Sequence, residues 1–196
     1  VGLLAEQSDK PVKSYSIGFD VDGYDEAGYA KLAAERYGTD HQAYYVTPDD
    51  LVANIPTVAA SLDQPFGNSS LLPAMICAER AREDGITKLL AGDGGDELFA
   101  GYTYYADYTD PQALHEELGR SVGELHQLNL QRVDRLTMAH SIEGRVPFLD
   151  TELIEVAMSI PTELKFRSDQ PPGIAEKWIL RKACEDLLPD QIVWRV

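Results

Sequence analysis

The sequence predicts an α/β fold in which a parallel sheet is flanked by helices. Short apolar runs alternate with amphipathic patterns in the order strand, helix, strand, helix, helix, strand. The third predicted strand leads directly into the glycine-rich segment 92–95, and a helical pattern follows that segment. Open α/β sheets place their ligands where a strand, a glycine turn and a helix meet in this way. The sequence therefore predicts a ligand site at segment 92–95.

Composition limits the kinds of partner that the chain can have. The 196 residues suffice for one domain or a domain with a subdomain. With 33 Asp and Glu against 17 Lys and Arg, the net charge is −16. This charge argues against nucleic acid or an anionic membrane as a partner, because both require a basic face. An anionic ligand would need divalent cations beside it.

Cysteine usage and hydropathy indicate the compartment. Cys77 and Cys184 lie in apolar, helical contexts without metal-ligand spacing, which is typical of buried free thiols in a reducing environment. Neither a signal peptide nor a long apolar span is recognisable. The sequence thus predicts a cytoplasmic protein.

The predicted strands all lie in the first half of the chain. They cover residues 12–19, 41–46 and 86–91. Helices are predicted over 24–37, from Thr47 onward and over 71–84. Thr47 followed by Pro48 is typical of a helix start, and Pro56 should kink or break that helix. The loop 63–70 either starts the following helix, with Ser69 or Ser70 as its cap, or contacts a ligand.

The second half of the chain is predicted to be helical. Asp110 and Pro111 begin a long helical stretch in which two glycines are weak points, Asp150 caps a helix that runs through Ile160, and the last helix begins at Glu176. Within the glycine turn, Asp96 and Glu97 stand where a helix would begin. They could cap that helix or hold a cation.

Several segments resemble one known family. They are Gly92–Tyr102 (GDGGDELFAGY), Glu143–Asp150 (EGRVPFLD), Glu176–Arg181 (EKWILR), Tyr15–Phe19 (YSIGF) and Asp63–Phe66 (DQPF). In this order and spacing they are similar to the synthetase domain of glutamine-hydrolysing asparagine synthetases. The resemblance covers nearly the whole chain.

This resemblance implies an adenine nucleotide α-hydrolase-like fold with a parallel five-stranded sheet and a helical C-terminal portion. Residues 1–106 would be the α/β nucleotide-binding part, and residues 107–196 the helical part of the same domain. The implied reaction joins the side-chain carboxylate of aspartate, or of a related substrate, to the α-phosphate of ATP. Magnesium pyrophosphate then leaves, and ammonia from a glutaminase domain of the same parent chain displaces AMP. The implied cofactors are ATP and Mg²⁺.

The resemblance also implies which residues bind the nucleotide and the metal. Ile17 matches the position whose backbone contacts adenine, and Ala91 and Gly92 match the pair that lines the nucleotide. Asp96 matches the carboxylate that holds magnesium and pyrophosphate. The alternative for Asp96 is a helix cap in an ordinary turn.

Two further residues are implied to be catalytic. Asp93 stands where many family members carry Glu and is a candidate acid or base for the attack of ammonia. Lys177 matches the lysine that neutralises charge on the phosphoryl group, and its alternative is a surface lysine at a helix start. Glu143 and Arg145 are predicted to form a structural ion pair that shapes the wall of the site, and direct contact with the ligand is the alternative.

The sequence also departs from the family pattern. It has neither the Ser-Gly-Gly-x-Asp-Ser loop, whose amides cradle pyrophosphate, nor a glutaminase with a leading cysteine. It thus resembles a synthetase domain truncated at both ends, so the fold should be incomplete and the fragment inactive. A homodimer or a strand rearrangement could cover the gap left in the sheet. Alternatives are a β-lactam synthetase-like or other carboxylate-amidating relative, or a non-catalytic synthetase-like binding domain.

Overall fold

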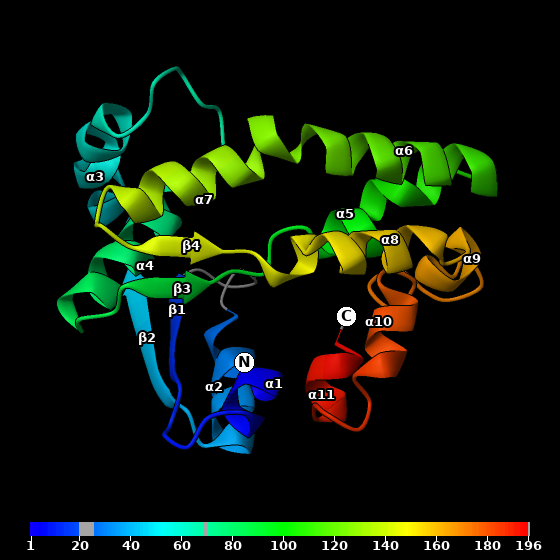
Figure 1. Ribbon diagram of the computed structural model, residues 1–196, viewed down its shortest axis with the longest axis horizontal. Helices are drawn as coiled ribbons and strands as arrows, with labels where there is room; N and C mark the ends of the chain where they lie inside the picture. The colour runs from blue at the N-terminus through cyan, green and yellow to red at the C-terminus, as the bar shows by residue number, and fades with distance from the viewer. Residues whose placement is uncertain (20–25, 69, 196) are drawn as a thin grey trace. The chain divides into compact units, whose positions relative to one another are not determined.

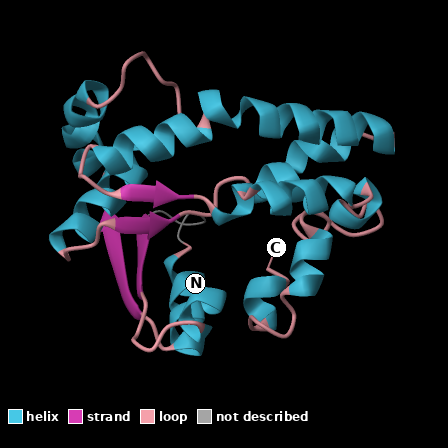
Figure 2. Cartoon of the chain, in the orientation of Figure 1, coloured by secondary structure: helices cyan, strands magenta, loops and turns pink. Residues whose placement is uncertain are grey.

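A computed structural model describes residues 1–19, 26–68 and 70–195 of the chain. These residues form a mixed α/β structure (Figures 1 and 2) that divides into two compact units. Unit 1 comprises Val1–Leu89 and Arg132–Gly144, and unit 2 comprises Leu90–Gln131 and Arg145–Val196. The predicted division at residue 106 concerns function rather than compactness and stays a prediction.

Unit 1 contains the first two predicted strands. They are confirmed as β1 (Lys13–Phe19) and β2 (Asp40–Val46), which run side by side and parallel (Figure 1), in a register that pairs Lys13 with Asp40 and Phe19 with Val46. Helix α1 (Gly2–Glu6) precedes them and α2 (Ala27–Tyr37) connects them. Gly38 ends α2 in the left-handed conformation, with φ 59°. The predicted start of this helix at Tyr24 lies outside the described residues.

The predicted start of the next helix is confirmed. Helix α3 (Pro48–Ala60) has a capping box, in which Thr47 and Asp50 each accept a hydrogen bond from the other's backbone N–H. Pro56 lies inside this helix, so the proline does not break it. The proline instead removes one backbone donor, a loss that the remaining helical hydrogen bonds tolerate.

Helix α4 (Leu71–Glu83) begins after Ser70, but the predicted side-chain cap is wrong for this serine. The Ser70 hydroxyl donates to Asn68 Oδ1 at 2.6 Å and accepts from Arg132. Because the hydroxyl is used in these contacts, it does not cap the helix. Ser69, the other candidate, lies outside the described residues.

The third predicted strand is shorter than expected and has an unpredicted partner. Strand β3 (Lys88–Leu90) pairs with β4 (Glu143–Arg145) in a second two-stranded sheet (Figure 2). Glu143 N donates to Thr87 O at 2.9 Å, and Ala91 N donates to Arg145 O at 2.8 Å, a parallel pattern. The expectation of one continuous sheet is therefore corrected. The described strands form two separate pairs: β1 hydrogen-bonds to β2, and β3 hydrogen-bonds to β4.

In the core of unit 1, residues 132–144 pack against helices α3 and α4. Leu136, from α7 (Asn129–Met138), packs with Val58, Leu71 and Met75. Ile142 is fully buried with Ala78 and Ala81. Gly144 lies so close to Val133 that an added Cβ would stand 2.7 Å from that side chain. This glycine therefore allows β4 to approach α7.

Unit 2 consists of short helices around one long helix. Its elements are α5 (Gly95–Phe99), η1 (Thr103–Asp107), α6 (Pro111–Glu124), η2 (Leu125–Gln127), η3 (Pro147–Leu149), α8 (Thr151–Ser159), α9 (Thr162–Lys165), α10 (Trp178–Ala183) and α11 (Asp190–Val193). The predicted caps Asp110 and Asp150 are confirmed, since each accepts hydrogen bonds from the first turn of its helix.

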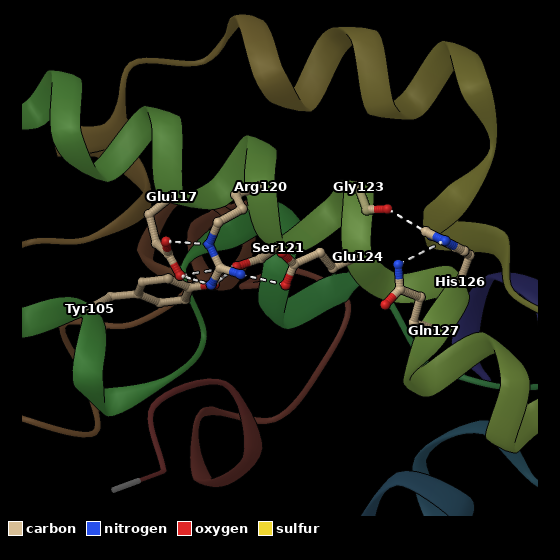
Figure 3. Close-up of polar contacts among 8 residues, drawn as sticks. All are labelled: Tyr105, Glu117, Arg120, Ser121, Gly123, Glu124, His126 and Gln127. Atoms are coloured by element: carbon tan, nitrogen blue, oxygen red, sulfur yellow. Dashed lines mark hydrogen bonds and ion pairs between the residues drawn. The ribbon is translucent and has the colours of Figure 1, made fainter. Parts of the chain in front are cut away.

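The charged residues of α6 are paired with each other along the helix. Arg120 binds Glu117, with Nη2 and Oε1 2.6 Å apart, and also binds Glu124 one turn later (Figure 3). On the same helix Ser121 Oγ accepts a hydrogen bond of 3.4 Å from the buried Tyr105. Pairs three and four residues apart stabilise a helix from within. The cluster in Figure 3 is therefore explained by helix stability and is not a candidate site.

Two apolar clusters form the core of unit 2. Tyr105 packs with Ala100, Leu114 and Leu118. Leu98 and Phe99 of α5 are buried against Ala157 of α8. This packing fixes the orientation of α5, whose first turn carries Asp96. Within the described parts of the chain, no helix is long and apolar enough to cross a membrane.

Candidate functional site

The glycine turn contains one glycine, Gly94, that admits no side chain, and one, Gly92, that is open. Gly94 is the N-cap of α5 and has φ 93°, a conformation that L side chains rarely adopt. A Cβ on Gly94 would also stand 2.4 Å from the Leu149 side chain. At Gly92, by contrast, an added Cβ would meet nothing within 4 Å. The turn is thus tightly packed at Gly94 and open at Gly92.

Residues 145–150, which belong to unit 2 like the glycine turn, support this turn. Phe148 packs edge-on against Phe99, with 6.2 Å between ring centroids and 73° between the rings. Ala91 N donates to Arg145 O, so backbone hydrogen bonding holds the residue that precedes the glycines. Two of the segments that carry the sequence resemblance therefore lie in contact within unit 2.

Asp96 and Lys177 form the polar centre of the site. Lys177 Nζ lies 2.8 Å from Asp96 Oδ1, and each side chain is about one-third exposed, at 32% and 35%. The N-cap of α5 is Gly94, so the alternative interpretation of Asp96 as the helix cap is wrong. The structure brings together the predicted metal ligand and the predicted catalytic lysine, which are distant in sequence. Their chemical roles stay predictions.

Gly101 provides the space that the Asp96 carboxylate occupies. A Cβ on Gly101 would stand 2.0 Å from Asp96 Oδ1 and 2.9 Å from the Asp96 Cα. The Gly101 N–H also donates to Asp96 O at 2.8 Å. The side chain of Asp96 is thus held over a residue that has none.

We expect Gly101→Ala to displace the Asp96 carboxylate and to destabilise the chain by about 1–3 kcal/mol, as overpacking does. Urea denaturation of the 196-residue chain measures this change. The matched control is Gly123→Ala, because Gly123 lies near the end of α6 with nothing within 4 Å of an added Cβ. That control should leave the stability unchanged or raise it by up to about 1 kcal/mol. Equal effects of the two substitutions would contradict the account of Gly101.

Glu97 has a structural role rather than a cation-binding one. Its side chain is buried, at 5% exposure, and its Oε1 accepts hydrogen bonds from Tyr102 at 2.6 Å and from Asn129 at 3.2 Å. Burial, together with this carboxylate, raises the pKa of the Tyr102 hydroxyl well above its usual value. The sequence-based possibility that Glu97 holds a cation is therefore corrected, because its oxygen already binds two donors inside the fold.

The remaining predicted residues lie at described positions, and their roles stay predictions. Ile17 lies in β1 of unit 1, opposite Tyr44 of β2. Ala91, Gly92 and Asp93 lie in the turn after β3, with Gly92 exposed and Asp93 half-buried. Glu143 and Arg145, which were expected to form an ion pair, are the two ends of β4.

The donor set for a metal is small. Among the described residues, no three His, Cys, Asp or Glu side chains are grouped so that they could hold a metal ion. Asp96 offers a partly exposed carboxylate beside the open turn, and Asp93 offers a half-buried one within it. Mg²⁺ commonly binds through one or two carboxylates and completes its shell with water and substrate phosphates. So few carboxylates fit a magnesium ion that arrives with a phosphate ligand better than a permanently bound one.

Sequence reasoning missed three polar residues of unit 2. Glu176 is buried at 4% exposure, and Arg181 donates hydrogen bonds to backbone carbonyls. Lys165 in α9 is fully buried, and within the described residues its Nζ has no hydrogen-bond partner. Burial lowers the pKa of Lys165 to about 8. The pattern TELKF contains no sign of this burial, since a lysine between polar and apolar residues is usually exposed.

Comparison with known proteins matches these segments to one family. The family model described as asparagine synthase matches residues 1–111 and 106–196. The chain is 33% identical to the glutamine-hydrolysing asparagine synthetase of Asparagus officinalis, over 97% of this chain and 33% of that protein. It is also 33% identical to the root enzyme of Pisum sativum and 32% identical to the enzyme of Triphysaria versicolor, over 97% and 93% of this chain.

The chain spans about a third of the length of these relatives, 33% and 32% of the Pisum and Triphysaria proteins. The family match extends over both compact units and includes the Asp96 turn and the Lys177 segment. Membership implies an adenine nucleotide α-hydrolase fold, of which the parallel strand pairs and flanking helices form a part. The chain belongs to the asparagine synthase family.

Proposed function

We propose that this chain is part of the synthetase domain of an ATP-dependent amide ligase. Its substrate is aspartate or a related carboxylate, which reacts at the α-phosphate of ATP to give an acyl adenylate and pyrophosphate. Ammonia then displaces AMP and yields the amide. The observation that supports this proposal most strongly is the Asp96–Lys177 pair at 2.8 Å, beside the open glycine turn in a chain that matches the family along its length.

The geometry of the Asp96–Lys177 pair would allow Lys177 to exchange Asp96 for another anionic partner. Lys177 is a compact cation with three donors, and its side chain is only partly exposed. An ion pair that solvent reaches is weak, so the Lys177 ammonium can exchange Asp96 for a phosphate oxygen at little cost. In its new position it stabilises the negative charge that develops on the phosphoryl group. Asp96 is released by the same exchange.

Released from Lys177, the Asp96 carboxylate can accept a cation. Bound Mg²⁺ would neutralise the leaving pyrophosphate. Asp96 would hold that ion through one oxygen, which agrees with its partly exposed position beside the turn. Such an arrangement also explains how a chain with a net charge of −16 binds a polyanion.

The backbone around Gly92 is the proposed contact surface for the nucleotide. Open space around its Cα lets a ligand approach the main chain closely. Ala91 would line the same nucleotide, and Ile17 would contact adenine through its backbone. Asp93, half-buried in the same turn, is proposed as the acid or base for ammonia.

The proposed partners follow from the same reaction. A glutaminase domain of the same gene product would supply ammonia. The chain by itself is proposed to be inactive, and a homodimer would cover sheet edges that the described strand pairs leave open.

The test is an ammonia-dependent assay of the complete gene product with ATP, Mg²⁺ and a panel of carboxylates. We expect aspartate to be amidated with release of AMP and pyrophosphate, and the isolated 196-residue chain to show no turnover. Amidation of another carboxylate in place of aspartate would favour a β-lactam synthetase-like relative. If calorimetry of the complete gene product shows no magnesium-dependent heat with ATP, the domain is non-catalytic and the proposal is wrong.

A further inference from the structure

Lys177 has an unusual backbone conformation. It is the N-cap of α10, with φ 52° and ψ 31°, in the left-handed region that residues other than glycine rarely occupy. Its N–H donates to Ala100 O at 3.4 Å, and Ala100 is itself left-handed, with φ 56°. A strained conformation of this kind persists only where surrounding contacts hold it. The neighbouring residues must therefore fix Lys177.

Arg181 contacts Lys177 and the loop that precedes it. One turn after Lys177, its guanidinium donates to Glu176 O at 2.9 Å and to Gly173 O at 2.6 Å. The Arg181 N–H also donates to Lys177 O at 2.9 Å, the first hydrogen bond of the helix. The same side chain thus holds both ends of the loop 173–176 that leads into Lys177.

Glu176 closes this loop from the other side. Its buried carboxylate accepts a hydrogen bond from Gly173 N at 2.8 Å. Gly173 has φ 88°, and while its N–H donates to Glu176 within the loop, its C=O accepts a hydrogen bond from Arg181 of α10. The loop is therefore tied through Glu176 and through Arg181, and Lys177 follows it directly.

We infer that Arg181 and Glu176 form a bracket that positions Lys177, by holding its backbone left-handed and thereby directing its ammonium to Asp96. The catalytic importance of this placement rests on the proposed function, whereas the placement itself does not. Arg181 is suited to the task because its planar group donates in several fixed directions. Lysine at this position would keep the charge but could not reach both carbonyls in the same geometry.

A purely structural role for Arg181 predicts different behaviour. Its Nη1 also donates to Val193 O at 2.6 Å and to Arg195 O at 3.2 Å, and these bonds anchor the segment around α11. If anchoring were the whole role, loosening α11 by Val193→Ala would have the same consequences for Lys177 as changing Arg181. Val193 is buried, at 4% exposure, and therefore makes a matched control.

The first experiment measures the accessibility of Lys177 in the 196-residue chain. An amine-reactive reagent labels the protein, and mass spectrometry follows the rate at Lys177. Because the Asp96 pair protects this ammonium, we expect Arg181→Lys to raise the rate about fivefold, as expected when a weak ion pair is lost. Val193→Ala should leave it unchanged. An unchanged rate in Arg181→Lys, or an equal rise in Val193→Ala, overturns the inference. If Arg181→Lys does not fold, Glu176→Asp tests the bracket through the Gly173 N–H.

The second experiment uses the complete gene product and a double-mutant cycle. We expect Arg181→Lys to lower kcat about tenfold with little change in KM for the carboxylate. In the Lys177→Met background, Arg181→Lys should cause no further loss of kcat. Equal losses in both backgrounds would show that Arg181 does not act through Lys177. If the gene product amidates no carboxylate, the proposed function fails, while the labelling result still decides the placement.

Discussion

Replacing Lys177 by methionine is expected to lower kcat of the complete gene product by about 10²–10³-fold, the usual cost of removing one preorganised group that stabilises transition-state charge. Methionine keeps the length of the side chain and removes its charge. The loss should appear mainly in kcat, because Lys177 is paired with Asp96 in the free protein and, in the proposed function, would reach the phosphoryl group only as charge develops. Steady-state kinetics with release of pyrophosphate as the readout measures it.

Lys182→Met is the matched control for this substitution. Lys182 lies on the same helix and forms an exposed ion pair with Glu185, with 2.8 Å between Nζ and Oε1. Surface pairs of this kind contribute little, so the control should keep nearly full activity. A similar loss of activity in both variants would mean that the helix, and not the Lys177 charge, is responsible.

Lys165→Met is expected to raise the free energy of unfolding at pH 7 by about 3 kcal/mol. The pKa of Lys165 falls from 10.5 to about 8 on burial. A pKa change of one unit corresponds to about 1.4 kcal/mol, so the charged form of Lys165 destabilises the folded state relative to the unfolded one. Methionine fills a similar space without a charge, and the melting temperature should rise by about 6–12 °C.

The pH dependence of the same comparison has a definite sign. Below pH 8 Lys165 is protonated in both the folded and the unfolded chain, so the full cost of burial is present. Between pH 8 and 10.5 the unfolded chain binds more protons than the folded one, so stability from this group rises with pH. The stabilisation gained by Lys165→Met should therefore shrink across this range and vanish above it.

Urea denaturation of both proteins from pH 7 to 11 measures this difference, in which the other titrating groups cancel. The control is Lys31→Met, because the Lys31 side chain is 74% exposed and its Nζ forms only a surface ion pair of 3.9 Å with Glu35 Oε1. It should change stability by less than about 0.5 kcal/mol at any pH. A destabilising Lys165→Met substitution would show that the ammonium finds a favourable partner in solution.

Local signals predicted the helix starts well. At Thr47, Asp110 and Asp150 the capping side chain and its backbone partners lie within a few residues of each other, so the sequence contains the whole interaction. The first two strands were predicted for the same kind of reason, because a run of β-branched and aromatic residues is itself the signal.

Features that depend on distant partners were not predictable. Strand β4 consists of Glu, Gly and Arg, which have no strand preference, and exists because its backbone pairs with β3. Lys165 and Glu176 are buried by elements that the sequence does not place beside them. The left-handed Lys177 likewise depends on Arg181, whose role no local pattern indicates.

The candidate site was predicted in part. The glycine turn and the resemblance indicated Asp96 and Lys177 separately, and the structure places their charged groups 2.8 Å apart. The sequence did not show that Gly101 makes room for the Asp96 carboxylate, since that requires the folded turn. It also offered Glu97 as a possible cation ligand, although burial with Tyr102 excludes it from that role.

In the proposed function, this chain helps to activate a carboxylate at the α-phosphate of ATP. Exchange of labelled pyrophosphate into ATP by the complete gene product, without any nitrogen donor, tests it most directly. We expect exchange that requires both aspartate and Mg²⁺ and that falls by about 10²–10³-fold in Lys177→Met. Exchange that is independent of any carboxylate, or that is unchanged in Lys177→Met, would contradict it.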